Sequence, residues 1–479
     1  MFAATLEKII AGGLLLTLVF AILAHGAVES WAIALIEIMI ALLLGVWGLR
    51  AFAARELRLS APAWTWPLIG LVILGVLQGI TLTRDNGLFS LSRDAEATRL
   101  VTLPLALFVI AALLGADVLQ KRRRVEWLLH ALTIGGFVLS LFAIIQKLTW
   151  NGKVYWIRPV TSGATSVFGP FANHNHFAGL MEMLALLPVA MILAGAVRRE
   201  ARLLYGFMAV IMSVATVLSL SRGGMISLAT ALAFLLTISL RARLSATQGD
   251  AVLPARLAGV GAVGLVAAAI LIGVLWIGAE PVLDRVTRGS LLESNTQTAT
   301  AQSTTDAAPA ANENFHSSRG WIWRDTITMI AAHPWLGVGL GAYQTAYPAY
   351  SRHDGSLIVD NAHNDYLHLL AETGVIGGAL ALWFLIAAVL AVARGLHSRD
   401  PLFLAVALGA GAGLAAMLTH SVFDFNLQSP ANAMTFLLLA VLADRAALAS
   451  ERVPAGGAIR EVISRKAEVS GQWPVISGR

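Results

Sequence analysis

Runs of apolar residues long enough to cross a lipid bilayer recur along the whole chain, and no other feature limits its fold so strongly. A spanning helix needs about 20 predominantly apolar residues. Because lipid offers no hydrogen-bond partner to an exposed backbone amide or carbonyl, such runs can cross it only as helices. The sequence therefore predicts an all-α polytopic membrane protein with about twelve transmembrane helices. The predicted spans are residues 9–25, 31–49, 66–82, 100–117, 127–146, 177–197, 203–220, 224–240, 257–279, 367–392, 402–420 and 431–447.

The positions of lysine and arginine predict the orientation of these helices. Cytoplasmic loops of membrane proteins carry an excess of both residues. With a cytoplasmic N-terminus and one crossing per run, the basic segments 121–124 and 198–202 lie on the cytoplasmic side. The net charge of +6 then reflects topology and contact with membrane lipids, and we expect no nucleic-acid partner. The chain has no cysteine, which excludes disulfides, thiolate metal sites and cysteine nucleophiles.

A polar cluster precedes and opens the apolar run at 367–392. It contains Asn361, His363, Asn364, Asp365 and His368. Ionisable groups at the edge of a membrane are costly and usually functional. The positive end of a helix dipole disfavours an imidazolium, so His363 is expected to be neutral and able to accept a proton as a general base. The alternative is a structural histidine that bonds to a neighbouring loop.

Three arginines on the predicted outer face are candidates for binding an anion. Arg222 joins two spans within Ser-Arg-Gly-Gly, and Arg319 and Arg324 flank a pair of tryptophans, Trp321 and Trp323. A guanidinium stays charged and matches a phosphate or carboxylate with two parallel hydrogen bonds. The alternative is that these arginines reach for lipid headgroups at the membrane interface.

A second polar cluster lies at another helix start on the same face. Asn173, His174 and His176 are followed within the apolar run by Glu182. Joined with His363 and Asp365, these histidines could form a metal site, but we favour a polar cap on the helix start, because residues two apart on a helix diverge. Glu182 is a candidate for substrate contact, with a buried hydrogen bond as the alternative.

Two further features have simpler interpretations. Asp424 lies between the last two spans and is expected to be a solvated loop acid. Gly337, Gly339 and Gly341 form a weak glycine pattern with no strand before it, so we predict a tight turn and no dinucleotide site.

Four motifs in order along the chain resemble the O-antigen ligase and polymerase superfamily of bacterial membrane glycosyltransferases. They are Phe-Gly-Pro-Phe-Ala-Asn-His-Asn-His-Phe-Ala-Gly at 168–179, Ser-Leu-Ser-Arg-Gly-Gly at 219–224, Arg-Gly-Trp-Ile-Trp at 319–323 leading to His-Pro-Trp-Leu-Gly-Val-Gly at 333–339, and Asn-Ala-His-Asn-Asp-Tyr-Leu at 361–367 running on to Glu-Thr-Gly-Val-Ile-Gly at 372–377. The resemblance covers about residues 165–430. It implies a fold like that of the C-type glycosyltransferases, with a large periplasmic loop before the last helices.

The resemblance also implies a reaction. Members of the superfamily transfer a glycan from an undecaprenyl-diphosphate-linked donor to a saccharide, lipid A-core or protein acceptor at the periplasmic face of the bacterial inner membrane. Carried over by motif, Arg222, Arg319 and His363 are the expected catalytic residues of an inverting transfer that needs no metal or other cofactor. The polar residues beside them are expected to bind substrate: Asn173, His174, His176, Glu182, Arg324, Asn364 and Asp365.

The same resemblance suggests a division of the chain. Residues 1–165 form N-terminal transmembrane helices, 166–449 form a ligase/polymerase-like catalytic region that includes an outer loop at 280–362, and 450–479 form a cytoplasmic tail. Ligase and polymerase activities both remain open. Two other classes are a transporter or flippase of a lipid-linked or anionic solute, and a metal-dependent membrane hydrolase. Polar residues gathered on one face, away from the midplane, disfavour the transporter.

Overall fold

Most of the described residues lie in helices. The computed structural model describes residues 2–57, 59–84, 87–159, 167–244, 315–352 and 358–451. Its α-helices are α1 (Phe2–Leu23), α2 (Ser30–Ala54), α3 (Thr65–Gly79), α4 (Ala95–Val118), α5 (Arg122–Leu148), α6 (His174–Leu184), α7 (Leu187–Leu193), α8 (Arg202–Leu218), α9 (Arg222–Leu244), α12 (Phe315–Ala332), α13 (Tyr343–Ala346), α14 (Asp365–Gly395), α15 (Pro401–His420) and α16 (Pro430–Glu451).

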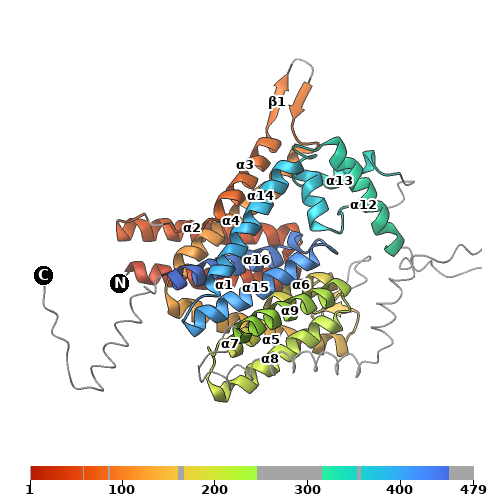
Figure 1. The fold of residues 1–479 in the computed structure, drawn as a ribbon. Helices are drawn as coiled ribbons and strands as arrows, with labels where there is room; N and C mark the ends of the chain where they lie inside the picture. The colour runs from red at the N-terminus through yellow and green to blue at the C-terminus, as the bar shows by residue number, and fades with distance from the viewer. Residues whose placement is uncertain are drawn as a thin grey trace, which may run out of the picture.

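The remaining elements are short. Four 3-10 helices lie at η1 (His25–Ala27), η2 (Arg199–Ala201), η3 (Tyr347–Ala349) and η4 (Asn426–Gln428). Strands β1 (Thr81–Arg84) and β2 (Gly87–Ser90) form one antiparallel hairpin, and β3 (Lys153–Val154) pairs with β4 (Arg158–Pro159). The first hairpin projects from the end of α3 (Figure 1).

Within the described residues, ten helices are long and apolar enough to cross a membrane. They correspond to ten of the predicted runs, and the chain is an all-α polytopic membrane protein as predicted. The run at 66–82 differs, because α3 has only 15 helical residues before the chain turns into β1. The predicted span at 257–279 and the polar segment 293–314 lie outside the described residues.

Side-chain caps define where several helices begin. Asp94 accepts a hydrogen bond from the Ala97 amide at 3.0 Å at the start of α4. Asp400 does the same for the Leu402 amide at 2.8 Å, with Pro401 in the first turn of α15. A cap satisfies a backbone amide that has no partner inside the helix, and proline tolerates the first turn because its missing amide is not needed there.

The centre of the bundle is formed by the C-terminal helices. α15 packs against α6, α7, α9 and α16, and α14 crosses α16 and α3 (Figure 1). In the most apolar stretch of α6 and α7, 94% of the residues are buried, whereas the figure for the corresponding stretch of α2 is 22%. α6 and α7 are therefore interior helices, and α2 leaves most of its surface to the surrounding lipid.

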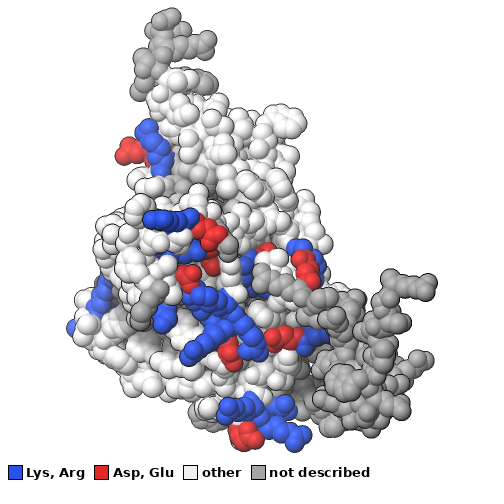
Figure 2. Space-filling model, turned by 90° about the vertical axis from the view of Figure 1, so that its left-hand side faces the viewer, with Lys and Arg blue, Asp and Glu red and all other residues white. Residues whose placement is uncertain are grey.

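The two ends of the bundle differ in charge. The end of α2 and the starts of α5 and α8 carry clustered lysines and arginines, which we call the basic end, and Figure 2 shows that face. There Arg50 donates to Asp117 at 2.7 Å, and Lys121 donates to Glu7 at 2.9 Å. The starts of α6, α9 and α14 lie at the opposite end, together with α12 and α13.

A small helical module covers the opposite end. α12, α13 and η3 share a core with the start of α14 that includes Met329, Tyr343 and Tyr347. The glycine-rich segment after α12 forms the predicted tight turn, with positive φ at each of its three glycines. It docks on a kink in α14 at Gly374, where φ is +62° and the Val375 amide donates to the Pro334 carbonyl at 2.8 Å. Only glycine adopts this backbone conformation without strain.

Candidate functional site

The connection from His420 to Asn426, between α15 and α16, is the point where the candidate site residues meet. We call it the 420–426 connection. It is mostly buried, and Asp424 is only 2% exposed. The starts of α6, α9 and α14 and one face of α12 all contact it, as the following contacts show. Four motifs that are distant in sequence thus share one short segment.

The start of α14 is bound to this connection by side-chain and backbone hydrogen bonds. Asn364 caps the helix by accepting from the Tyr366 and Leu367 amides at 3.0 Å, and its own amide group donates to the Val422 carbonyl at 3.0 Å. Asp365 accepts from the Ser421 hydroxyl at 2.9 Å. Both residues, which the sequence predicts to bind substrate, therefore hold α14 against the 420–426 connection in this structure.

His363 precedes this cap in an unusual backbone conformation. Its φ is +50°, in the left-handed region that residues other than glycine rarely adopt. The imidazole Nδ1 lies 3.7 Å from Asp424 Oδ1, and the ring meets Phe425 edge to face at 5.1 Å between centroids. The His363 side chain is 14% exposed. The imidazole thus lies beside a carboxylate and keeps a small exposed area.

The prediction that Asp424 is a solvated loop acid is wrong. Asp424 is buried, accepts a hydrogen bond from the side-chain amide of Asn175, and accepts from the Phe425 amide at 2.9 Å. Burial alone would raise the pKa of Asp424, but the interaction with His363 and the charge of Arg319 lower it below the ordinary value. Asp424 is therefore a carboxylate at neutral pH, held beside the imidazole.

Arg319 contacts the same connection from α12. Its Nη1 donates to the Phe423 carbonyl at 3.0 Å, and its side chain is half-buried. One turn later, Trp323 Nε1 donates to the Ala362 carbonyl at 2.9 Å. Arg324 is exposed and, at five residues from Arg319, projects about 140° around the helix. The structure therefore brings Arg319 to the site and turns Arg324 away from it.

Arg222 is the first residue of α9, and the glycines after it explain how α9 approaches the site. A Cβ on Gly223 would lie 2.5 Å from His420 Nε2, and one on Gly224 would lie 2.6 Å from the Cβ of Ala178 in α6. The Ser221 hydroxyl accepts from the Gly224 amide at 3.1 Å and caps the helix. Arg222 is half-buried at this junction.

Glu182 lies beneath the junction. It is fully buried, and both of its carboxylate oxygens lie within hydrogen-bond distance of His420 Nδ1, at 3.0 and 3.1 Å. This is the buried hydrogen bond that the sequence offered as the alternative to substrate contact. Since His420 in turn lies against Gly223, Glu182 supports the start of α9 from inside the bundle.

The second polar cluster forms a helix cap. Asn173 accepts from the Asn175 amide at 2.9 Å, and His174 is half-buried beside it. His176 is buried, with its ring edge-on to Phe425 at 5.1 Å between centroids. Phe425 thus contacts both His176 and His363. Within the described ranges, no group of three or more His, Asp or Glu side chains is arranged to hold a metal ion.

Sequence reasoning missed Asp424 and Asn175 as members of the site. Both lie at the same end of the bundle as His363 when the predicted spans are counted, so the topology offered a signal. Burial was the missing information, because it depends on how α6, α14 and α15 pack.

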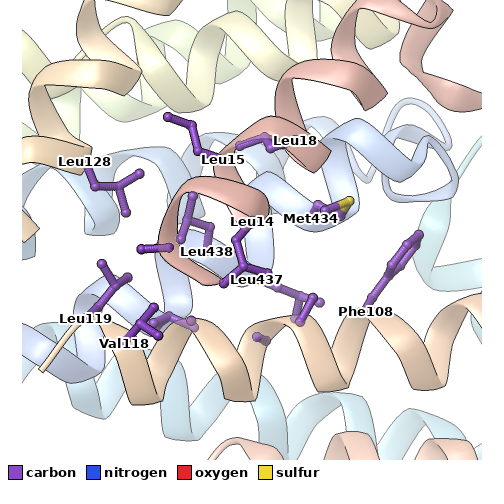
Figure 3. Close-up of a pocket in the computed structure, with 15 residues that line it drawn as sticks. Leu14, Leu15, Leu18, Phe108, Val118, Leu119, Leu128, Met434, Leu437 and Leu438 are labelled. Carbon is purple, nitrogen blue, oxygen red and sulfur yellow. The ribbon is translucent and has the colours of Figure 1, made fainter. Parts of the chain in front are cut away.

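An apolar cavity lies away from this site, among α1, α4, α5 and α16 (Figure 3). Its lining includes Leu14, Phe108, Leu128, Met434 and Leu437, and every lining residue is apolar. No residue of the 420–426 connection contributes to it. A charged reaction centre would find no partner there, so the cavity suits hydrocarbon and not a diphosphate.

Comparison with known proteins gives one family match. Residues 207–382 match the family model described as O-antigen ligase. The match includes Arg222, Arg319 and His363, and it ends before Asp424. No curated protein matches the chain.

Proposed function

The chain belongs to the O-antigen ligase/polymerase family of membrane glycan-transferring proteins, and we propose that it transfers a glycan from an undecaprenyl-diphosphate-linked donor to a saccharide acceptor. The observation that carries this proposal is the pairing of His363 with Asp424 at 3.7 Å, next to Arg319. Glycosyl transfer from a diphosphate needs a base for the acceptor hydroxyl and positive charge for the leaving group, and a carboxylate beside the base stabilises its protonated form. Lipid A-core sugar and protein are further acceptors compatible with the same chemistry.

His363 acts as the general base. Its Nδ1 faces Asp424, so in the neutral ring Nδ1 carries the proton, and the lone pair on Nε2 is the one that accepts the proton of the acceptor hydroxyl. The acceptor hydroxyl attacks the anomeric carbon, its proton passes to Nε2, and the bond between that carbon and the diphosphate oxygen breaks. A single displacement from the opposite side inverts the anomeric configuration. Asp424 stabilises the imidazolium that forms, and general bases contribute about 10²–10⁴-fold to such rates.

Arg319 and Arg222 stabilise the leaving diphosphate. Arg319 uses Nη1 on the Phe423 carbonyl, while its Nε has no hydrogen-bond partner within the described structure. A guanidinium has five donors, so Arg319 can bind the 420–426 connection and a phosphate oxygen together. Arg222 approaches from the capped start of α9, where the helix dipole also favours an anion. These cations act where negative charge develops in the transition state.

The proposed location is the bacterial inner membrane, with the site on the periplasmic side. The supporting observation is the concentration of lysine and arginine at the basic end of the bundle, the pattern of a cytoplasmic face. The lipid-linked donor would then reach the site laterally from the bilayer. Asn173 and His174, both half-buried at the same end, are the remaining candidates for contacts with the glycan.

A purified preparation tests this function directly. The protein in lipid nanodiscs is incubated with a labelled undecaprenyl-diphosphate oligosaccharide, with and without lipid A-core. A ladder of products identifies a polymerase, and a single shifted acceptor band identifies a ligase. Absence of transfer to either acceptor, from a preparation whose spans are intact, would contradict the proposal.

A further inference from the structure

One turn of α12 donates hydrogen bonds to the backbone immediately before the proposed base and immediately before its partner carboxylate. Arg319 and Trp323 are four residues apart and therefore project from the same face of the helix. Arg319 donates to the carbonyl of Phe423, the residue before Asp424, at 3.0 Å. Trp323 donates to the carbonyl of Ala362, the residue before His363, at 2.9 Å. The two hydrogen bonds are equivalent in position relative to the two reactive side chains.

The bond from Trp323 restrains the backbone next to His363, whose φ is unusual. The Ala362 carbonyl belongs to the same planar peptide unit as the His363 amide. Holding this carbonyl in place therefore fixes the orientation of the peptide plane that, with the His363 N–Cα bond, defines φ of His363. That φ is +50°, which a non-glycine residue keeps only when its surroundings determine it. The amide of Ala362 itself lies 3.4 Å from His368 Nδ1, so both backbone polar groups of Ala362 have partners. Ala362 is itself fully buried.

We propose that Trp323 is a positioning residue for glycosyl transfer, and that its indole N–H, through the Ala362 carbonyl, holds the His363 imidazole in register with Asp424. The inference rests on the proposed function. The indole N–H is the donor of this bond, and phenylalanine supplies an aromatic ring without that donor. Without it the peptide unit can rotate toward a relaxed φ, and the imidazole moves away from the acceptor hydroxyl.

The test compares W323F with W321F. Trp321 lies on the same helix and is 42% exposed, so W321F controls for loss of an indole from α12. We expect W323F to lower kcat by about 10²-fold, as a displaced catalytic group does, with KM changed less than about two-fold. W321F should keep kcat near the starting value. Equal kcat values for the two variants, or a loss in W323F that appears only in KM, would overturn the proposal.

A double-mutant cycle separates positioning from loss of folding. If Trp323 and Asp424 both act by orienting His363, the W323F/D424N variant should be hardly slower than D424N alone. Independent, multiplicative losses would contradict the proposal. Both outcomes differ from failure of the proposed function, in which H363A itself would retain normal transfer. Unchanged thermal unfolding of W323F in nanodiscs confirms that the kinetic comparison is between folded proteins.

Discussion

Asp424 Oδ1 lies 3.7 Å from His363 Nδ1, although the two residues lie on either side of an entire helical hairpin formed by α14 and α15. Asp424 is buried and accepts a hydrogen bond from the side-chain amide of Asn175 in α6. The carboxylate therefore has partners from two directions and cannot turn freely into solvent. A neutral residue of the same shape at this position removes the charge and keeps the packing.

D424N is predicted to lower kcat by about 10²–10⁴-fold. The amide cannot stabilise the imidazolium, and it can hold the ring in the wrong tautomer by presenting a donor to Nδ1. The rate of glycan transfer at saturating donor is the measurement. A D424N enzyme with wild-type kcat would mean that the carboxylate has no part in the reaction.

The ionised state of Asp424 also predicts how stability depends on pH. Its pKa is lowered in the folded protein, because its partners outweigh the raising effect of burial. A lowered folded pKa stabilises the fold fully above the unfolded value of about 3.9, and this contribution is lost as the pH falls toward the folded pKa. The stability difference between wild type and D424N should therefore be largest near pH 7 and should shrink below about pH 4. A difference that is constant from pH 7 to pH 3, measured by denaturation in nanodiscs, would contradict the assigned charge.

The sequence was enough to predict the ten membrane-spanning helices of the described residues and to name His363 as a candidate site residue. Length and apolarity determine spans because lipid leaves the backbone no alternative. His363 became a candidate because an ionisable side chain at a helix start near the membrane edge is costly. The environment of Asp424 could not be predicted in the same way. An acid in a short connection between two spans is ordinarily solvated, and the burial of Asp424 arises from the packing of α6 and α14 over it.

The shorter α3 illustrates a similar limit. Residues 66–82 have the composition of a span, but the helix ends at Gly79 and the chain enters β1. Gln78 is fully buried and donates to the Leu336 carbonyl at 2.6 Å in the glycine-rich turn. This contact between segments far apart in sequence ties the end of α3 to the outer module, and no local pattern predicts it.

G223A should destabilise the start of α9. The new methyl group would lie 2.5 Å from His420 Nε2, and Glu182 holds that ring in place, so the clash cannot be relieved by a simple rotation. We expect a loss of about 1–3 kcal/mol in stability, as overpacking typically causes, together with reduced transfer. The matched control is G206A in α8, where a Cβ would meet nothing within 4 Å. Equal thermal stability of the two variants would show that α9 and His420 are not closely packed.

R319K is predicted to lower kcat strongly, because lysine keeps the charge but cannot bind the Phe423 carbonyl and a phosphate oxygen with a rigid fork of donors. A loss of about 2.7–4 kcal/mol in transition-state stabilisation is the scale for removing one such donor. R199K, an exposed change at the basic end, serves as the control. Equal steady-state rates for R319K and R199K would show that Arg319 does not stabilise the leaving diphosphate.

The most direct test of the central claim is the transfer rate of H363A with a labelled undecaprenyl-diphosphate donor, measured beside the wild type in the same nanodiscs. Loss of the base should reduce kcat by about 10²–10⁴-fold while the protein still folds and still binds donor. Turnover at the wild-type rate would show that another group accepts the acceptor's proton, and the pairing of His363 with Asp424 would then need a different explanation.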